Sequence, residues 1–273
     1  MGTEQHYAKA IADCDAAGAA SPAAAPTTAG GRVALVIGNG AYDHPHIGPL
    51  PNAPNDANTI ANCLRLIDFD VGEPKNNLDR AGMVTQIDDF LRRAEHSQIA
   101  VVYYAGHGAQ IDGRNYLVPI DFEVQNRMTH AVDVDTIIAR LDNPRRTNIL
   151  ILDACRNNPK VPRVASAGHD RGIEPGLAAL ASLGTGSPLG AGTLVAGAGT
   201  LIAFATAPGQ VALDGEGANS PFSAALSHHI GTPGLEVQQM LTRVRAEVVA
   251  ATNSRQVPWS NSSLLGEVYL AEK

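Results

Sequence analysis

The segment Thr147–Asn158, TNILILDACRNN, decides the fold of this chain. Its apolar part, Asn148–Leu152, alternates little, which is typical of a strand that is covered on both faces of a parallel sheet. The strand ends at Asp153 and Cys155, and open α/β sheets place their ligand crevices at the carboxyl ends of strands. Cys155 is therefore a candidate nucleophile. The alternative is a buried, inert cysteine, which is the commoner state of a lone cysteine.

A second apolar segment has the same design. Gln98–Gly108, QIAVVYYAGHG, ends in His107 between two glycines, and glycines let a ligand come close to the main chain. If the two strands are neighbours in the sheet, the imidazole of His107 and the thiol of Cys155 lie in one crevice, where the imidazole can accept the thiol proton. A histidine and a cysteine that each end a buried strand form a more specific signal than either residue alone.

The composition fits one compact α/β domain. With 273 residues, of which 44% are hydrophobic, the chain can build a substantial core. Its net charge of −7 and its scattered lysines and arginines argue against nucleic-acid binding, and an acidic balance tolerates cationic substrates. No apolar run approaches the ~20 residues that span a bilayer, so we expect no membrane partner.

The cysteines and the amino terminus favour a cytoplasmic location. Cys14, Cys63 and Cys155 are an odd number without CxxC spacing, so neither a disulfide framework nor a zinc site is predicted, and a reducing compartment fits best. The amino terminus lacks the basic and apolar regions of a signal peptide, although a trimmed chain would look the same.

Predicted strands and helices alternate along the chain. Besides the two strands above, the predicted strands are Arg32–Gly38, Phe69–Gly72 and Leu201–Thr206, with edge strands at Gln256–Trp259 and Leu264–Leu270. The predicted helices are Ala57–Ile67, Arg80–His96, Val132–Leu141, Ser220–Ile230 and Leu235–Ala251. Such alternation predicts a mostly parallel sheet with helices on both faces.

Three further segments are irregular or local. The loop Asn39–Asp56 is rich in Gly, Pro and Asn and is expected to line the crevice. The segment Gln110–Pro119 carries Asp112-Gly113, a turn signal that predicts a hairpin. Residues 159–199 are dominated by Gly, Ala, Ser and Pro, and a loop of ~40 residues is usually functional or disordered.

These stretches resemble the caspase-like cysteine peptidases, within them the paracaspase and metacaspase branch with its bacterial orthocaspases. The matching stretches follow the family's order through most of residues 32–270 and are VALVIGNGAY, NDANTIANCLRLIDFDV, YYAGHG, NYLVPID, ILILDACRNNP and AFATAPGQVALDG. The resemblance implies an α/β caspase-like fold, in which a mostly parallel sheet of about six strands lies between two helical layers.

The resemblance also implies a domain organisation. A single peptidase domain would occupy residues 32–273, after a flexible segment at residues 1–31. Within it, a large region at 32–159 and a small region at 200–273 would be joined by a processable linker at 160–199. Lys160, Arg163 and Arg171 are candidate self-cleavage sites there, because their small-residue surroundings are open to proteolysis.

His107 and Cys155 correspond to the family's catalytic dyad, and the amides of Gly108 and Cys155 to its oxyanion hole. Backbone N–H groups that point at the developing oxyanion are usually the largest single contribution to acyl-transfer catalysis. The resemblance therefore implies a cysteine endopeptidase.

If the chain is an enzyme of this kind, three acids indicate which substrate residue it accepts before the scissile bond. True caspases precede their cysteine with Gln-Ala and bind a substrate aspartate through arginines, whereas here Asp153 and Ala154 precede Cys155. Asp56 matches a pocket acid of paracaspases and metacaspases, and Asp214 matches a third acid of paracaspases. Three converging carboxylates would bind arginine through a charge-assisted fork, with lysine as a less well matched substitute. The structural alternatives are that Asp56 caps a helix and that Asp214 is a turn residue.

We therefore expect protein or peptide substrates with Arg or Lys before the scissile bond, and no required cofactor. The scattered acids show no EF-hand spacing, and the sequence leaves calcium dependence undecided. Asp43, His44 and His46 suggest a metal site only weakly, because Pro45 separates the histidines and no matching ligand set is present, so no metal site is predicted.

Two other functions stay open. A caspase-like pseudoenzyme would act as a scaffold through protein–protein interaction, although such proteins normally lack the histidine or the cysteine. A different α/β hydrolase would need a GxSxG elbow, which the chain lacks. The edge strand near Leu265–Leu270 leaves both a monomer and a homodimer open, because an exposed edge can pair with a second copy.

Overall fold

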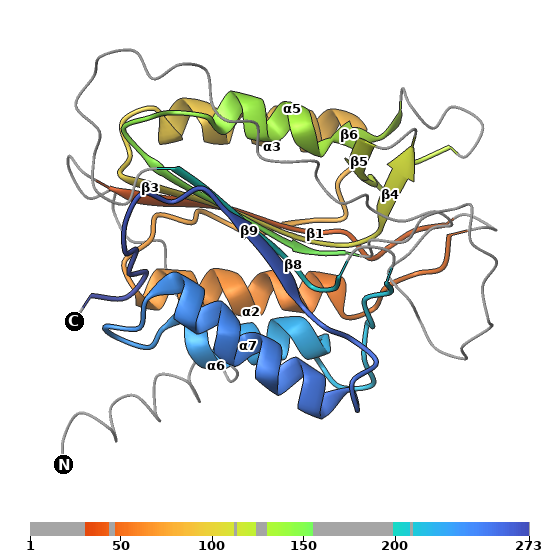
Figure 1. Ribbon diagram of the computed structural model, residues 1–273. Helices are drawn as coiled ribbons and strands as arrows, with labels where there is room; N and C mark the ends of the chain where they lie inside the picture. The colour runs from red at the N-terminus through yellow and green to blue at the C-terminus, as the bar shows by residue number, and fades with distance from the viewer. Residues whose placement is uncertain are drawn as a thin grey trace.

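The computed structural model describes residues 31–43, 47–111, 114–123, 130–154, 199–207 and 210–272. A central six-stranded sheet lies between two helical layers (Figure 1). Its strands, in spatial order, are β2 (Lys75–Asn76), β1 (Arg32–Gly38), β3 (Ile99–Ala105), β7 (Thr147–Asp153), β8 (Gly199–Phe204) and β9 (Trp259–Ser262). All neighbours pair in parallel except β8 and β9. The predicted three-layer, mostly parallel α/β fold is confirmed.

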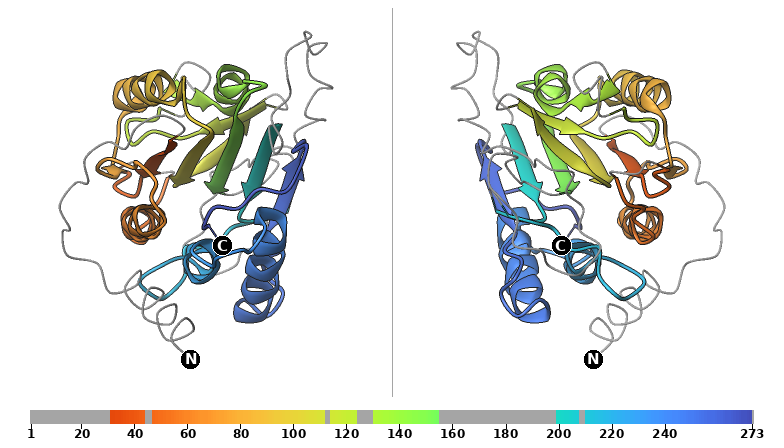
Figure 2. Two further views of the ribbon diagram at one scale, coloured as in Figure 1. Left: turned by 90° about the vertical axis from the view of Figure 1, so that its left-hand side faces the viewer. Right: turned by 90° about the vertical axis from the view of Figure 1, so that its right-hand side faces the viewer.

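The helices divide between the two faces of the sheet. On one face lie α3 (Arg80–Ala94) and α5 (Val134–Leu141), and on the other lie α2 (Ala53–Leu66), α6 (Pro221–Ile230) and α7 (Val237–Ala251) (Figure 1). Two further views show that β9 forms the sheet edge above α7 (Figure 2). The predicted positions of all these helices are correct to within a few residues.

The long apolar runs of the central strands fill two cores at once. In one register row, Val101 pairs with Ala34 and Ile149, and these side chains join the core under α2, α6 and α7. In the next row, Val102 and Leu150 join the core under α3 and α5. Full burial of such a side chain contributes about 1.5–3 kcal/mol. Because both faces of these strands are covered, apolar residues are favoured at every position, and polar and apolar residues do not alternate.

Two helices begin at different residues from those predicted. Helix α2 begins at Ala53, four residues earlier than predicted, with Asn52 at its N-cap and Pro54 in the first turn. A proline fits there because backbone N–H groups in the first turn have no partner within the helix, so its missing N–H costs no hydrogen bond. Asp56 therefore lies inside the first turn, and the interpretation of Asp56 as the helix cap is wrong. Helix α5 begins two residues later than predicted, because Val132–Asp133 pairs with β5 as a short strand.

Three strand predictions are wrong. Phe69–Gly72 is not a strand: it makes one bridge, between Val33 and Asp70, and Gly72 then turns the chain with a φ of 63°. The strand that follows is β2. At the other edge, the predicted strands Gln256–Trp259 and Leu264–Leu270 are replaced by β9, together with one bridge between Glu236 and Tyr269.

A small antiparallel sheet stands beside the carboxyl ends of the central strands. It consists of β4 (Gly108–Ile111), β5 (Arg114–Leu117) and β6 (Val132–Asp133). The pairing of β4 with β5 confirms the predicted hairpin.

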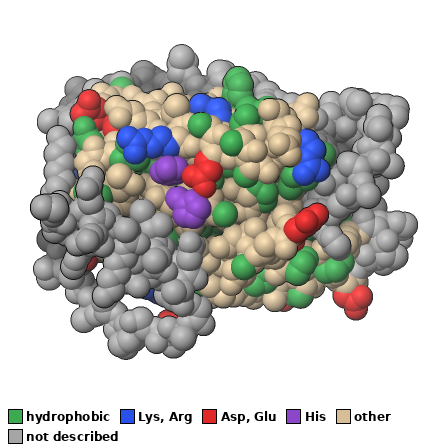
Figure 3. Space-filling view, turned by 90° about the horizontal axis from the view of Figure 1, so that it is seen from below, with side chains coloured by type: hydrophobic (Ala, Val, Ile, Leu, Met, Phe, Trp, Pro, Cys, Tyr) green, Lys and Arg blue, Asp and Glu red, His purple; other side chains and the backbone are tan. Residues whose placement is uncertain are grey.

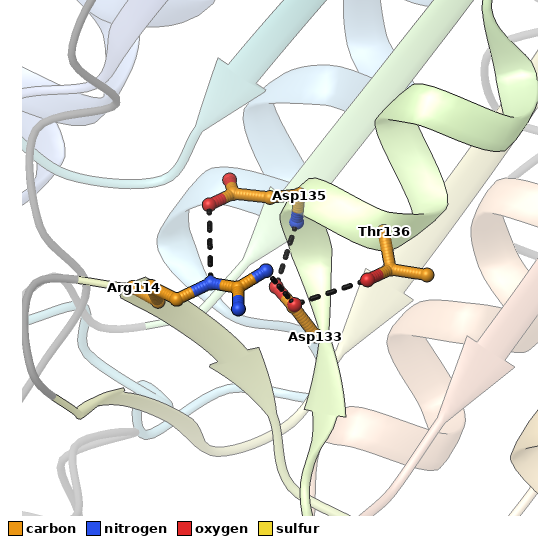
Figure 4. A network of polar contacts seen from close by, with 4 residues as sticks. All are labelled: Arg114, Asp133, Asp135 and Thr136. Carbon is orange, nitrogen blue, oxygen red and sulfur yellow. Dashed lines mark hydrogen bonds and ion pairs between the residues drawn. The ribbon is translucent and has the colours of Figure 1, made fainter.

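Polar contacts tie this small sheet to helix α5 (Figure 4). Asp133 accepts hydrogen bonds from Asp135 N and Thr136 Oγ1, both at 3.0 Å, and so caps α5. Arg114 on β5 contacts the carboxylates of both Asp133 and Asp135. Burial raises the pKa of Asp135, the charge of Asp133 raises it further, and Arg114 lowers it.

A buried cation stands at the amino end of β7. Arg146 is 4% exposed, and its guanidinium donates to Asn148 Oδ1 (2.7 Å), to the carbonyl oxygen of Leu141 (2.7 Å) and to that of Ala94. Ala94 and Leu141 end α3 and α5, and terminal carbonyls of helices favour a positive charge. Burial lowers the pKa of Arg146.

The cysteines differ from the expectation in one respect. Cys63, which is buried on α2, is disulfide-bonded, whereas the cysteine pattern predicted no disulfide framework. The other two cysteines, Cys14 and Cys155, lie outside the described residues. Within the described part of the chain, no helix is long and apolar enough to cross a membrane.

Candidate active site

The strands that lead to the predicted dyad are neighbours, as the sequence interpretation requires. Ala105 at the end of β3 pairs with Asp153 at the end of β7, and Gly106 N donates to Asp153 O at 3.2 Å. His107 and Cys155 each follow the paired residue by two positions. Cys155 itself lies outside the described residues, so its role stays a prediction.

The imidazole of His107 is held in one tautomer. Its Nε2 lies 2.7 Å from the carbonyl oxygen of Gly48, and because a carbonyl only accepts, Nε2 carries the proton. In the neutral ring, Nδ1 is then the basic nitrogen. The Tyr42 ring packs edge-on against the imidazole, with 4.6 Å between the ring centroids. A fixed imidazole of this kind suits a general base.

The loop that holds His107 is the one that the sequence predicted to line the crevice. Tyr42 and Gly48 both belong to Asn39–Asp56, and the side chain of Tyr42 and the carbonyl of Gly48 both reach His107. The sequence did not indicate which residues of this loop make the contacts. Gly108 follows His107 and begins β4, opposite Leu117. The oxyanion hole that its amide would form with that of Cys155 stays a prediction.

The structure brings together two of the predicted pocket acids through one serine. Asp56 and Asp153 are both fully buried. Ser220 N donates to Asp56 Oδ1 at 2.9 Å, and Ser220 Oγ donates to Asp153 Oδ2 at 2.5 Å. Ser223 Oγ also donates to Asp153 Oδ2, at 2.6 Å. Helix α2, strand β7 and the first turn of α6 therefore meet at these carboxylates.

The third acid joins the same network through the N-cap of α2. Asp214 is fully buried, and its Oδ2 accepts a hydrogen bond from Asn52 N at 3.2 Å. The Asn52 side chain donates to Asp214 O at 2.8 Å, and Asn52 O accepts from Asp56 N at 2.8 Å. Asp214 does precede a turn glycine, Gly215 (φ 86°), but its carboxylate also contacts the start of a helix. All three predicted acids are thus buried near the starts of α2 and α6, and we call them the acidic cluster.

Helix starts supply the donors of this acidic cluster. Ser220 is the N-cap of α6 and Asn52 is the N-cap of α2. N–H groups at the start of a helix favour a nearby negative charge, as does the helix dipole. The hydroxyl of Ser223 is itself 2.5 Å from the Tyr103 hydroxyl on β3. The backbone N–H groups and hydroxyls of these helix starts thus contribute to stabilising the carboxylates.

Sequence reasoning missed Asn52, Ser220, Ser223 and Gln256 as parts of the site. Gln256 fixes both ends of the segment before Asp214, because its Oε1 accepts from Leu213 N (3.0 Å) and its Nε2 donates to Ala205 O (2.9 Å). The Ser-Pro start of α6 was the only available signal, since it marks a helix N-cap but does not reveal what the serine contacts.

No metal site emerges from the described residues, among which no group of three or more His, Cys, Asp or Glu side chains is arranged to hold an ion. Of the weak candidate set, Asp43 is exposed, and His44 and His46 lie outside those residues. Figure 3 shows histidine side chains beside an acidic one on the face seen from below. Between α6 and α7, His228 Nδ1 and His229 Nε2 contact the two oxygens of Glu247, at 2.6 and 2.9 Å. These contacts join α6 to α7.

Comparison with known proteins gives two kinds of match. Residues 31–269 match the family described as the caspase domain. Over 129 residues the chain is 33% identical to the mouse protein "Mucosa-associated lymphoid tissue lymphoma translocation protein 1 homolog" and to its human counterpart. The matched region covers 46% of this chain and only 15% of each relative. The family match spans most of the chain, and the protein therefore belongs to the caspase-domain family of cysteine peptidases.

Proposed function

We propose that this protein is an endopeptidase that cleaves after arginine and, more slowly, after lysine, with Cys155 as nucleophile and His107 as base. The observation that carries the proposal is the buried cluster of Asp56, Asp153 and Asp214 at the end of the strand that leads to Cys155. The family membership supports the peptidase chemistry, and the acidic cluster supports the specificity.

The proposed chemistry follows from the orientation of His107. With the Nε2 proton bound to Gly48 O, Nδ1 accepts the proton of the Cys155 thiol, and the thiolate attacks the substrate carbonyl. The imidazolium then gives the proton to the leaving amine, which leaves a thioester. Water, deprotonated by His107, hydrolyses the thioester and restores the thiol. The amides of Gly108 and Cys155 are the proposed donors to the oxyanion.

The preference for arginine follows from charge and geometry. Three acidic side chains lie buried near the end of the strand that leads to Cys155, and a cation is the ligand whose charge complements them. A carboxylate offers about four lone-pair sites, so Asp153 can keep both serine hydroxyls and still accept from a substrate. A guanidinium presents a planar fork of N–H donors to such a cluster, whereas an ammonium donates from a single atom.

A panel of fluorogenic peptides that differ only in the residue before the scissile bond tests this proposal. We expect cleavage in the order Arg, Lys, then citrulline, with none after Asp. Citrulline keeps the shape of arginine but is neutral, so its kcat/KM should be lower by about 100-fold or more. Runs with calcium and with a chelator show whether calcium is required. A preference for Asp, or equal cleavage after citrulline and Arg, contradicts the acidic pocket.

A scaffold without activity is the second candidate function. Its supporting observation is that all three acids are fully buried and hydrogen-bonded within the protein, as purely structural acids would be. An arginine chloromethyl ketone distinguishes the two functions by mass spectrometry. We expect it to label Cys155 in the wild type and to label His107→Ala much more slowly. No labelling, with calcium and without, favours the scaffold.

We also propose that the enzyme cuts its own linker. Lys160, Arg163 and Arg171 lie outside the described residues, so this proposal rests on their residue type and sequence surroundings alone. The wild type should give new termini at one or more of these residues under the conditions that support peptide cleavage, and Cys155→Ala should stay intact. An intact linker in both proteins rejects self-processing.

The oligomeric state is a separate question at β9. This edge strand begins with Trp259, which is 46% exposed, and is followed by Leu265, which is 57% exposed. An edge of this kind can pair with a second copy of the chain. Sedimentation velocity over a range of concentrations, with Trp259→Lys as the comparison, decides between a monomer and a homodimer through β9.

A further inference from the structure

Two buried phenols hold the main chain of His107. We propose that Tyr42 and Tyr104 are positioning residues, whose hydroxyl groups fix the backbone of His107 on both sides and thereby direct its imidazole. The inference rests on the proposed role of His107 as the catalytic base. It adds to that role two residues that touch neither the substrate nor the thiol in the proposed mechanism.

The hydrogen bonds reach His107 from opposite sides. His107 N donates to Tyr42 Oη at 3.1 Å, and Tyr104 Oη donates to His107 O at 2.9 Å. The two hydroxyl oxygens lie 3.3 Å apart, and both tyrosines are buried. Tyr42 comes from the loop after β1, and Tyr104 comes from β3 itself. The peptide groups on both sides of the His107 Cα are therefore held by the hydroxyls of Tyr42 and Tyr104.

The same hydroxyls join His107 to the end of β5. Val118 O lies 3.0 Å from Tyr42 Oη and 2.9 Å from Tyr104 Oη, and Val118 N donates to His107 O at 3.1 Å. Each phenol has one proton. If Tyr42 donates to Val118 O and Tyr104 donates to His107 O, both carbonyls are served, and the Tyr42 oxygen can accept from His107 N. Loss of either hydroxyl removes one of these bonds from a buried peptide group.

Gly106 shows that the space beside His107 is shaped for these phenols. A Cβ atom at position 106 would lie 2.4 Å from Tyr104 Oη and 2.9 Å from Tyr42 Oη, well inside normal contact. The first glycine of the AGHG sequence is therefore needed to admit the two hydroxyls. From the sequence, this glycine suggested an unusual backbone conformation or the close approach of a ligand, not contact with two phenols.

The Tyr42 side chain makes two contacts with His107 that a mutation can separate. Its ring packs against the imidazole, and its hydroxyl binds the His107 main chain. Tyr42→Phe keeps the ring and removes the hydroxyl. Tyr104→Phe removes the other hydroxyl and leaves the β3 core packing in place. Neither residue belongs to the described hydrogen bonds of Asp56, Asp153 and Asp214, so substrate binding should be largely preserved.

The test compares wild type with Tyr42→Phe, Tyr104→Phe and the double variant on an arginine peptide. We expect kcat to fall by about 10- to 100-fold in each single variant, because misplacement by about 1 Å can cost 100-fold, while KM changes by less than about threefold. Alkylation of Cys155 by iodoacetamide, followed against pH, should move its midpoint to higher pH as the imidazole supports the thiolate less well. The double variant should lose less than the product of the two single losses.

Tyr269→Phe is the matched control. It removes a phenol that donates to Glu267 Oε2 at 2.6 Å, on a segment outside the described contacts of His107 and the three acids, and it should behave as wild type. If His107→Ala is as active as wild type, the proposed function fails. If His107→Ala is inactive but both Phe variants keep the wild-type kcat and alkylation profile, even with a lower Tm, the positioning role is wrong. If Tyr104→Phe does not fold, Tyr42→Phe decides alone.

Discussion

The two ends of β7 bury opposite charges, and helix ends of opposite polarity surround them. At the amino end, the guanidinium of Arg146 donates to carbonyls that end α3 and α5. At the carboxyl end, Asp153 accepts from Ser220 and Ser223, in the first turn of α6. Helix C-termini stabilise cations and helix N-termini stabilise anions. Each charge therefore lies where the neighbouring helices favour it.

The two ends differ in the number of like charges. Arg146 is a single cation whose described acceptors are neutral oxygens on the two helices and on β7. Asp153 shares its network with Asp56 and Asp214, and three carboxylates are more than the capping of two helices requires. Like charges in one buried cluster disfavour the folded state. The amino end is thus built for stability, and the excess of acid at the carboxyl end is what the proposed arginine specificity requires.

Substitution at the amino end should have the largest effect, and on stability alone. Arg146→Met removes the guanidinium donor of the buried Leu141 carbonyl and of Asn148 Oδ1, whereas Ala94 O keeps Ser97 as a donor. We therefore expect the free energy of unfolding to fall by about 2–4 kcal/mol. Urea unfolding measures this change. The kcat of the folded fraction should stay near the wild-type value.

Arg140→Met is the control for Arg146→Met. Arg140 forms an exposed ion pair with Asp88 at 2.7 Å, so its loss should change stability by no more than about 1 kcal/mol. Equal effects of the two substitutions would show that the buried guanidinium has no special role.

At the carboxyl end, Asp153→Asn should act on substrate choice. The substitution keeps the shape and removes one charge from the acidic cluster, so we expect kcat/KM for the arginine peptide to fall by about 100-fold. The preference for arginine over citrulline should shrink with it. Asp89→Asn, an exposed acid on α3, should leave both values unchanged. An unchanged arginine-to-citrulline ratio in Asp153→Asn would mean that Asp153 serves α6 rather than the substrate.

Substitution of Asp135 should have the smallest effect on stability. It shows how much a partly exposed acid at the start of a helix contributes, for comparison with the buried Asp153. Its pKa is raised in the folded protein, so the native state binds the proton more tightly than the unfolded chain does. This contribution to stability is present at low pH and is lost as the pH rises through the raised value. Asp135→Asn should therefore stabilise by at most about 0.5 kcal/mol at pH 7, since the side chain is 40% exposed, and by nothing near pH 3.

Urea unfolding of wild type and Asp135→Asn at pH 3 and pH 7 measures this difference. A lower stability of the variant at pH 7 would show that the attraction to Arg114 outweighs burial and the repulsion from Asp133.

The fold was predictable because its central strands are long, apolar and unbroken. The same periodicity could not locate β2, which has only two residues, Lys75 and Asn76, and is polar. It also placed the start of α2 too late, because Pro54 was taken as a loop residue although a proline fits the first turn. A two-residue strand and the first residue of a helix depend on contacts with distant parts of the chain, which the local sequence does not reveal.

The candidate site was predictable as residue types but not as a network. The resemblance supplied Asp56, Asp153 and Asp214, and the structure adds that Ser220 and Asn52 link them. The hydroxyl pair around His107 joins residues 62 positions apart, and nothing in either local sequence indicates that they meet. The sequence analysis made no prediction for Arg146, whose burial depends on contacts with the distant ends of α3 and α5.

The pairing of β7 with β8 has a consequence for the connectivity of the chain. Six consecutive residue pairs, from Thr147 with Gly199 to Leu152 with Phe204, join the sheet across the predicted linker. Asp153 adds its serine contacts to α6 on the far side of that linker. A cut between residues 160 and 199 would therefore convert one polypeptide into two that stay together as a noncovalent heterodimer, with the central seam of the sheet intact.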